Sequence, residues 1–254
     1  MIQLENAYWV ANSMDAWEQV NEAFLKREEE FLKFRNYHHA LYAYDLVLGI
    51  RNPKVDPNFD FGRHFNYTKN KWKALINNYL DYEELNQIKK EVQEAEQGKN
   101  IYNLAMQFTN KHGHGKNCLL SMVFSRRFDT SPTIVVFLRA SEITKRLICD
   151  LLFFQRIGEY VYGETKFQLV IHFNQLFNDD TVLLMYHVHK DVKAIIKSHP
   201  NWETPRGKDL LSTLDKLLKV NPEDMKYKVH RRVAKVLHPE LYKYPKTLAK
   251  DCTL

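Results

Sequence analysis

The sequence predicts an α+β protein in which helices pack on a large mixed β-sheet. Short apolar runs typical of strands alternate with longer stretches of helical periodicity, and no internal repeat is present. The composition is that of a folded chain, because 44% of the 254 residues are hydrophobic and only 8 are glycine and 8 proline. This length is sufficient for one large domain with a substantial core.

The first half of the chain predicts two strands and two helical segments. Residues 7–10 predict a short strand, and Ser13 is the expected N-cap of the helix that follows it. Residues 46–50 predict a second strand, which ends at an Asn-Pro turn. Residues 69–92 then show the apolar spacing of one or two helices.

The second half continues this alternation. Residues 118–124 and 133–138 predict two apolar strands, and the polar turn between them indicates a hairpin. Residues 141–162 predict a helix with a continuous apolar stripe, and residues 166–176 predict a further helix. Residues 181–188 predict another strand, with a helix after it.

Two units are expected on this basis. Residues 1–204 form the core, and residues 205–254 form a helical, basic C-terminal extension packed on it. Between Lys226 and Lys250 the chain carries many basic residues, with Glu240 as the sole acid. The extension is either a solvated surface or a contact for nucleic acid, and both interpretations fit the overall net charge of +6.

The sequence favours a cytoplasmic location. No apolar run approaches the roughly 20 residues that a membrane span needs, and no basic segment leads into an apolar one at the start of the chain. The three cysteines, Cys118, Cys149 and Cys252, have neither paired nor metal-type spacing, as expected for reduced thiols. No membrane partner is expected.

The first candidate block for chemistry begins with Arg139 at a strand end. Glu142 follows three residues later, and Asp150 follows eleven residues after the arginine, which is close to three helical turns. A carboxylate at the edge of an apolar stripe needs a partner. Asp150 is therefore either half of a structural ion pair with Arg146 or a functional carboxylate.

Two further blocks contain candidate ligand-binding side chains. His187 and His189 alternate on a predicted strand and therefore point to one face, where they can hold a sugar hydroxyl or a phosphate. No third ligand stands near them, so a metal site is not expected. Arg126 and Arg127 lie side by side at a strand end, where arginines either bind a phosphate or remain solvated.

Taken in order, these blocks resemble the thymidylate synthases and their deoxycytidylate hydroxymethylase relatives. The resemblance identifies Arg126 and Arg127 with an arginine pair that contacts phosphate in the partner's site, and Arg139 with a second phosphate-binding arginine. Glu142 replaces the family's aspartate. Asp150 falls where the pyrimidine edge is read, and aspartate there is the cytosine-type choice.

The same resemblance identifies His187 with the residue that holds the sugar, and His189 stands where tyrosine is usual. It implies a thymidylate-synthase-like fold, a homodimer, and methylene-tetrahydrofolate as a candidate cofactor. Glu142 and Asp150 are the candidate catalytic residues. The substrate-binding residues expected on this basis are Arg126, Arg127, Arg139, Ser141, Asp150, His187 and His189.

The sequence departs from the family pattern at the nucleophile. The family cysteine is expected between the arginine pair and Arg139, and residues 128–138 contain none. That thiolate attacks C6 of the pyrimidine and turns C5 into a nucleophile. Cys118 and Cys149 lie outside the interval, and each is interpreted as an apolar core residue unless the fold brings it to the site.

Two hypotheses for function remain. The first is a hydroxymethyl- or methyltransferase-like enzyme that modifies a pyrimidine nucleotide or a base in DNA. The second is a catalytically inactive relative that binds nucleotide or nucleic acid. The missing cysteine favours the second hypothesis, and the cluster of polar site residues favours nucleotide binding in both.

Overall fold

The computed structural model of the chain describes most of the first two thirds of the sequence and parts of the rest. The described residues are 7–25, 41–62, 67–108, 117–127, 130–144, 146–163, 166–178, 203, 205–219 and 246–254.

A six-stranded mixed sheet organises the described chain, with strand order β1-β2-β6-β5-β4-β3. The pairs β1–β2 and β5–β6 are parallel, and the other neighbours are antiparallel. The protein is therefore a mixed sheet packed by helices, as the sequence predicts. The strands are β1 (Ala7–Asn12), β2 (Leu41–Asn52), β3 (Tyr102–Gln107), β4 (Leu119–Arg126), β5 (Thr133–Glu142) and β6 (Gln168–Asn178).

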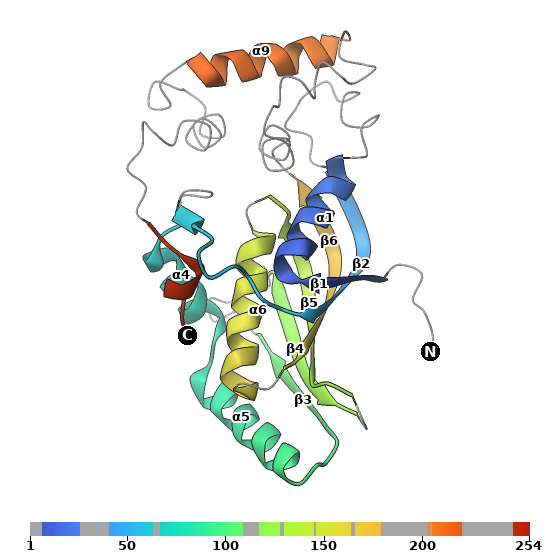
Figure 1. Cartoon of the computed structure of the whole chain (residues 1–254), viewed down its shortest axis with the longest axis vertical. Coiled ribbons are helices and arrows are strands. Elements are labelled where there is room, and N and C mark those ends of the chain that lie inside the picture. The colour runs from blue at the N-terminus through green and yellow to red at the C-terminus, as the bar shows by residue number, and fades with distance from the viewer. Residues whose placement is uncertain are drawn as a thin grey trace.

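The helices that cover the sheet lie on one of its sides, with α6 running along the strands (Figure 1). Helix α9 stands apart from this layer, beyond the end of the sheet near α1 (Figure 1). None of the helices in the described ranges is long and apolar enough to cross a membrane. The helices are α1 (Ser13–Leu25), α4 (Lys69–Tyr79), α5 (Tyr82–Gln97), α6 (Leu147–Tyr162), α9 (Pro205–Lys219) and the short 3-10 helix η3 (Ala249–Asp251).

The predicted hairpin is confirmed. Strands β4 and β5 pair antiparallel from Ser125 opposite Thr133 to Leu119 opposite Leu138. Their inward residues are fully buried, and β5 continues to Glu142, beyond the predicted end of the strand. The longer β5 shortens the following helix, which begins at Leu147 rather than at Ser141.

The helix predicted over residues 166–176 is wrong, because this segment is the central strand β6. Leu169, Ile171 and Phe173 alternate with half-buried residues, which is the period of two that a strand requires. β6 pairs with β2 on one side and β5 on the other. Val170 and Phe177 are also apolar and are half-buried, so apolar residues occur on both faces of the strand and its pattern is easily mistaken for a helix.

The start of α1 also differs from the expected capping. Ser13 is the first residue of the helix rather than its cap, and its side chain is buried. The carbonyl oxygen of the Asn12 side chain instead accepts hydrogen bonds from the backbone N–H groups of Met14 and Asp15, at 2.9 and 3.0 Å. Asn12 therefore satisfies amide groups that the first turn leaves free.

Helix α6 is the centre of the core. Apolar residues surround almost its whole circumference, and its buried side chains include Leu151, Phe154 and Ile157. A helix that is apolar on all sides must be covered on all sides, and α1, α5 and β5 contact it. Just before α6, the indole nitrogen of Trp17 donates to the carbonyl of Ile143 at 2.9 Å, which ties α1 to the loop between β5 and α6.

The last nine residues, 246–254, pack against α4 and α6, so the C-terminus lies beside α4 (Figure 1). The Arg156 guanidinium on α6 donates to the backbone carbonyls of Cys252 and Ala249, at 2.8 and 2.9 Å. The indole of Trp72 donates to the carbonyl of Thr253 at 2.8 Å. These bonds fix the end of the chain against the core.

The opposite face of the sheet is more open. Phe137 is 37% exposed and stacks on His172, with ring centroids 4.9 Å apart. Trp9, which is 49% exposed, lies over the backbone of Gly49, where any larger side chain would collide with the indole. Partial burial lowers the pKa of His172. This face therefore carries apolar side chains that none of the described helices covers.

Candidate active site

The hairpin brings Cys118 beside Arg139. The backbone N–H of Arg139 donates to the carbonyl of Cys118 at 2.7 Å, continuing the pairing of β4 and β5. Cys118 is a free, half-buried thiol, and Arg139 is exposed. A thiol and a guanidinium therefore start from neighbouring backbone positions, although 21 residues separate them in the sequence.

Ser141 on β5 forms a hydrogen bond with Asp150 on α6. The Ser141 hydroxyl donates to Asp150 Oδ2 at 2.7 Å, so the end of the strand and the first turn of α6 are joined by a short hydrogen bond. Within the described chain, Asp150 and Arg146 do not come within 4 Å as an ion pair, so Ser141 is the hydrogen-bonding partner that the structure shows. Arg146 still acts at a distance, because its charge lowers the pKa of Asp150.

The net effect on Asp150 is a raised pKa. Burial disfavours the ionised carboxylate and raises the pKa to about 6, although the hydrogen bond from Ser141 and the charge of Arg146 both oppose the rise. Asp150 therefore changes its protonation state in the range between pH 5 and 7. Groups with strongly shifted pKa values are concentrated at functional sites.

Tyr79 lies at the backbone of Cys118 and near enough to Asp150 for the two groups to interact electrostatically. Its hydroxyl oxygen accepts from the backbone N–H of Cys118 at 3.4 Å. Burial raises the pKa of Tyr79, and the nearby Cys118 and Asp150 disfavour its phenolate further. Burial also raises the pKa of Tyr67. The charge of Asp150 raises this pKa further, and the charge of Arg146 lowers it. Both tyrosines are therefore neutral groups beside the carboxylate.

Glu142 is the last residue of β5. Its side chain is buried, and its Oε1 accepts hydrogen bonds from the backbone N–H of Thr144, at 3.1 Å, and from the Thr144 hydroxyl. The donors of these two hydrogen bonds both belong to Thr144, in the turn that follows β5. The arrangement favours a role in shaping the turn from β5 to α6.

Arg126 and Arg127 lie at the other end of the hairpin. Six residues of strand separate Thr133, near the pair, from Arg139, which corresponds to about 20 Å. Arg126 also forms an ion pair with Glu96, at 3.8 Å. The structure thus places Arg139 and Ser141 on one strand and joins Ser141 to Asp150, and it leaves the arginine pair far from this end of the hairpin.

The two histidines expected to hold the sugar, His187 and His189, lie outside the described residues. In the described ranges, no group of three or more histidine, cysteine, aspartate or glutamate side chains could hold a metal ion.

Tyr79 and Tyr67 are the residues of the candidate site that the sequence analysis did not single out, whereas Cys118 was interpreted as an apolar core residue unless the fold brings it to the site. For Cys118 the signal was available in the predicted hairpin. Antiparallel pairing across its turn places residue 118 opposite the end of the second strand, beside Arg139. No comparable signal existed for the tyrosines, because Tyr79 reaches the site from a helix 39 residues before Cys118.

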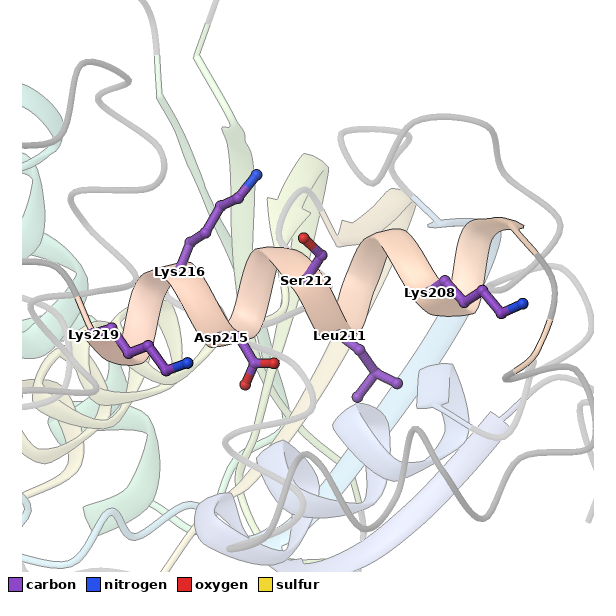
Figure 2. Close-up of a pocket in the computed structure, with 6 residues that line it drawn as sticks. All are labelled: Lys208, Leu211, Ser212, Asp215, Lys216 and Lys219. Carbon is purple, nitrogen blue, oxygen red and sulfur yellow. The ribbon is translucent and has the colours of Figure 1, made fainter.

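A pocket of about 490 Å³ lies elsewhere, along α9 (Figure 2). Its lining combines three lysines with Leu211, Ser212 and Asp215, and the side chains point in different directions from the helix (Figure 2). None of the predicted site residues takes part. The lysines are Lys208, Lys216 and Lys219. We place the candidate site at the N-terminal end of α6, where Ser141 holds the Asp150 carboxylate of shifted pKa two residues along β5 from Arg139.

No protein-family model matches the sequence, and a search of curated proteins found no match.

Proposed function

We propose that this protein binds a pyrimidine nucleotide and catalyses transfer of a one-carbon group to C5 of the pyrimidine, in the manner of the thymidylate synthases and deoxycytidylate hydroxymethylases it resembles. One observation supports the proposal: strand β5 carries both Arg139, whose backbone N–H donates to Cys118, and Ser141, whose hydroxyl donates to Asp150 at the start of α6. The substrate is a free nucleotide or the same base within DNA.

Each site residue is assigned to one part of the nucleotide. Arg139 binds the phosphate through charge-assisted hydrogen bonds. Asp150 accepts a hydrogen bond from the exocyclic amino group of cytosine, where uracil presents a carbonyl oxygen instead. His187 and His189 are assigned to the sugar on the resemblance alone.

The chemistry starts at Cys118. Its thiolate adds to C6, the C5–C6 double bond becomes a carbon nucleophile at C5, and C5 forms a bond to an electrophile. Loss of the C5 proton to a base and departure of the thiolate then restore the double bond and the free enzyme. Tyr79, whose hydroxyl lies at the backbone of Cys118, is positioned to contact the reacting ring.

Arg146 is a candidate residue for binding a negatively charged one-carbon donor. Its side chain is exposed, it lies close enough to Asp150 and Tyr67 to affect their pKa values, and it has no ion pair with another described residue. The glutamate carboxylates of methylene-tetrahydrofolate fit such a cation. When bound, this cofactor would supply the one-carbon electrophile for C5.

A test of the thiol step does not need the donor. Reversible addition of the thiolate exchanges the C5 hydrogen with solvent, so deoxycytidine monophosphate should lose its H5 signal in D₂O when the protein is added. We expect Cys118→Ala to abolish exchange while nucleotide binding remains. The matched thiol variant Cys149→Ala, inside α6, should exchange normally.

The outcomes separate the hypotheses. Exchange that persists in Cys118→Ala would remove the nucleophile assignment. Nucleotide binding without any exchange by the parent protein would favour the binding-protein alternative. Absence of binding to cytidine and uridine nucleotides and to single-stranded DNA would overturn the proposal as a whole.

We also propose that the protein is a homodimer formed through the open face of the sheet. Phe137, His172 and Trp9 give this face an apolar character. The distance of about 20 Å between Arg139 and the arginine pair supports a second copy as the occupant. Arg126 and Arg127 can contact a phosphate near Arg139 only if they belong to another protomer.

A further inference from the structure

We propose that Ser141 is a positioning residue that sets the base preference of this site by fixing the orientation of the Asp150 carboxylate. The inference rests on the proposed function, since it concerns how the same site distinguishes cytosine from uracil. The observation behind it is the 2.7 Å hydrogen bond from Ser141 Oγ to Asp150 Oδ2.

Ser141 is well placed to impose an orientation. Its side chain is 4% exposed, and its backbone lies in β5, paired with Leu176 of the central strand β6. A hydroxyl held by a sheet moves little, whereas the carboxylate of an aspartate rotates broadly about its terminal torsion. The bond therefore restricts Asp150 to one orientation.

The hydrogen bond also gives the two oxygens of the Asp150 carboxylate different roles. Oδ2 is occupied by Ser141, which leaves Oδ1 as an acceptor for a donor on the ligand. Because Arg139 precedes Ser141 by two residues on the same strand, β5 sets the position of both the phosphate contact and the base contact. The separation between them then depends on β5 and on the first turn of α6, which the Ser141 hydrogen bond joins.

Without Ser141 the carboxylate could turn and present either oxygen. It could then accept from the N3–H group of uracil as readily as from the amino group of cytosine, because both are N–H donors. Loss of the hydroxyl should therefore reduce discrimination between the bases more than it reduces affinity for the phosphate.

The charged and titratable groups around Asp150 allow a second, independent measurement. Arg146 and Cys149 flank it on α6, and Tyr67 and Tyr79 face it from the segment leading into α4 and from α4 itself. Within this set, the hydrogen bond from Ser141 is the largest influence that lowers the pKa of Asp150. Its removal should move the titration of Asp150 upward from about pH 6.

The experiment compares Ser141→Ala with Ser141→Thr, which keeps a hydroxyl, and with Ser125→Ala, which removes a serine hydroxyl from the far end of the same hairpin. Affinities for deoxycytidine and deoxyuridine monophosphate are measured at pH 8, where Asp150 is ionised. The carboxyl carbon of Asp150 is titrated by NMR in the ligand-free protein, with Asp150→Asn to assign its signal.

We expect Ser141→Ala to reduce the cytosine preference on the order of tenfold and to raise the Asp150 midpoint by about one pH unit, as the loss of one hydrogen bond to a charged group implies. Ser141→Thr and Ser125→Ala should stay near the parent. If Ser141→Ala does not fold, Ser141→Cys, which keeps the volume but donates weakly, should show the same losses.

An unchanged preference and midpoint in folded Ser141→Ala or Ser141→Cys would overturn the positioning role, provided that the parent prefers cytosine. A parent protein without base preference would instead overturn the assignment of Asp150 in the proposed function. A change in melting temperature alone, with both readouts intact, would mean that Ser141 is structural, and this too contradicts the inference.

Discussion

Asp150 is held where its ionised form is poorly solvated, since burial raises its pKa to about 6 from an ordinary value of 3.8. In the folded protein the group therefore binds a proton more tightly than in the unfolded chain. Between about pH 4 and pH 6 the folded state carries more protons, so the free energy of unfolding falls as the pH rises through this window. The ionised carboxylate of Asp150 is thus kept at a cost in stability.

Replacing Asp150→Asn should remove this cost. At pH 8 we expect the free energy of unfolding to increase by about 1–3 kcal/mol, which corresponds to a pKa shift of about two units. At pH 4, where the parent carboxyl is largely protonated, the change should be small. Urea denaturation at both values measures it, with exposed Asp45→Asn as the control. Equal effects at both pH values would contradict the explanation.

Arg139 is the residue on which phosphate binding should depend most. Charge-assisted hydrogen bonds contribute about 1.5–3 kcal/mol, so Arg139→Ala should weaken nucleotide binding by about tenfold to more than a hundredfold. Binding of the nucleoside, which lacks the phosphate, should change little. Calorimetry with both ligands measures the difference, and Arg51→Ala, an exposed arginine on β2, serves as the control. Equal losses for nucleotide and nucleoside would argue against a phosphate contact.

At the scale of the elements, local sequence patterns predicted those strands that are bounded by a clear polar turn. The hairpin of β4 and β5 was recognisable because a polar turn separates two apolar runs. β6 was mistaken for a helix because Val170 and Phe177 leave it without a clean polar face. The role of Cys118 was left open because its distance from Arg139 is set by strand pairing rather than by sequence spacing.

The contact between α6 and the start of β6 also depends on a pairing that local patterns do not reveal. Gly158 on α6 faces Phe167, and a Cβ atom at this glycine would lie 2.1 Å from the ring. Gly158→Ala should therefore destabilise the protein by about 1–3 kcal/mol despite the better helix propensity of alanine. Thermal unfolding tests this expectation. Gly98→Ala, beside a flexible asparagine side chain at 3.0 Å, should be nearly neutral.

At the scale of the whole molecule, the sheet has two different faces. One is covered by α6 and its neighbours, and the other presents Phe137, His172 and Trp9. The arginine pair and Arg139 lie at opposite ends of the hairpin, so the site proposed here is complete only if another protomer contributes. Assembly through the open face would bury the apolar side chains. The same assembly would bring the arginine pair of one protomer to the site of the other.

Phe137→Asp tests this assembly directly. In a monomer the aspartate would be solvated, because Phe137 is 37% exposed, but in the proposed dimer it would be buried against apolar side chains at a cost of several kcal/mol. Sedimentation velocity at micromolar concentration should show a dimer for the parent and a monomer for the variant, with unchanged circular dichroism. Tyr82→Asp, at a 42% exposed position on α5, should remain dimeric. A monomeric parent would leave Arg126 and Arg127 without a role, whereas a dimeric Phe137→Asp would move the interface to another surface.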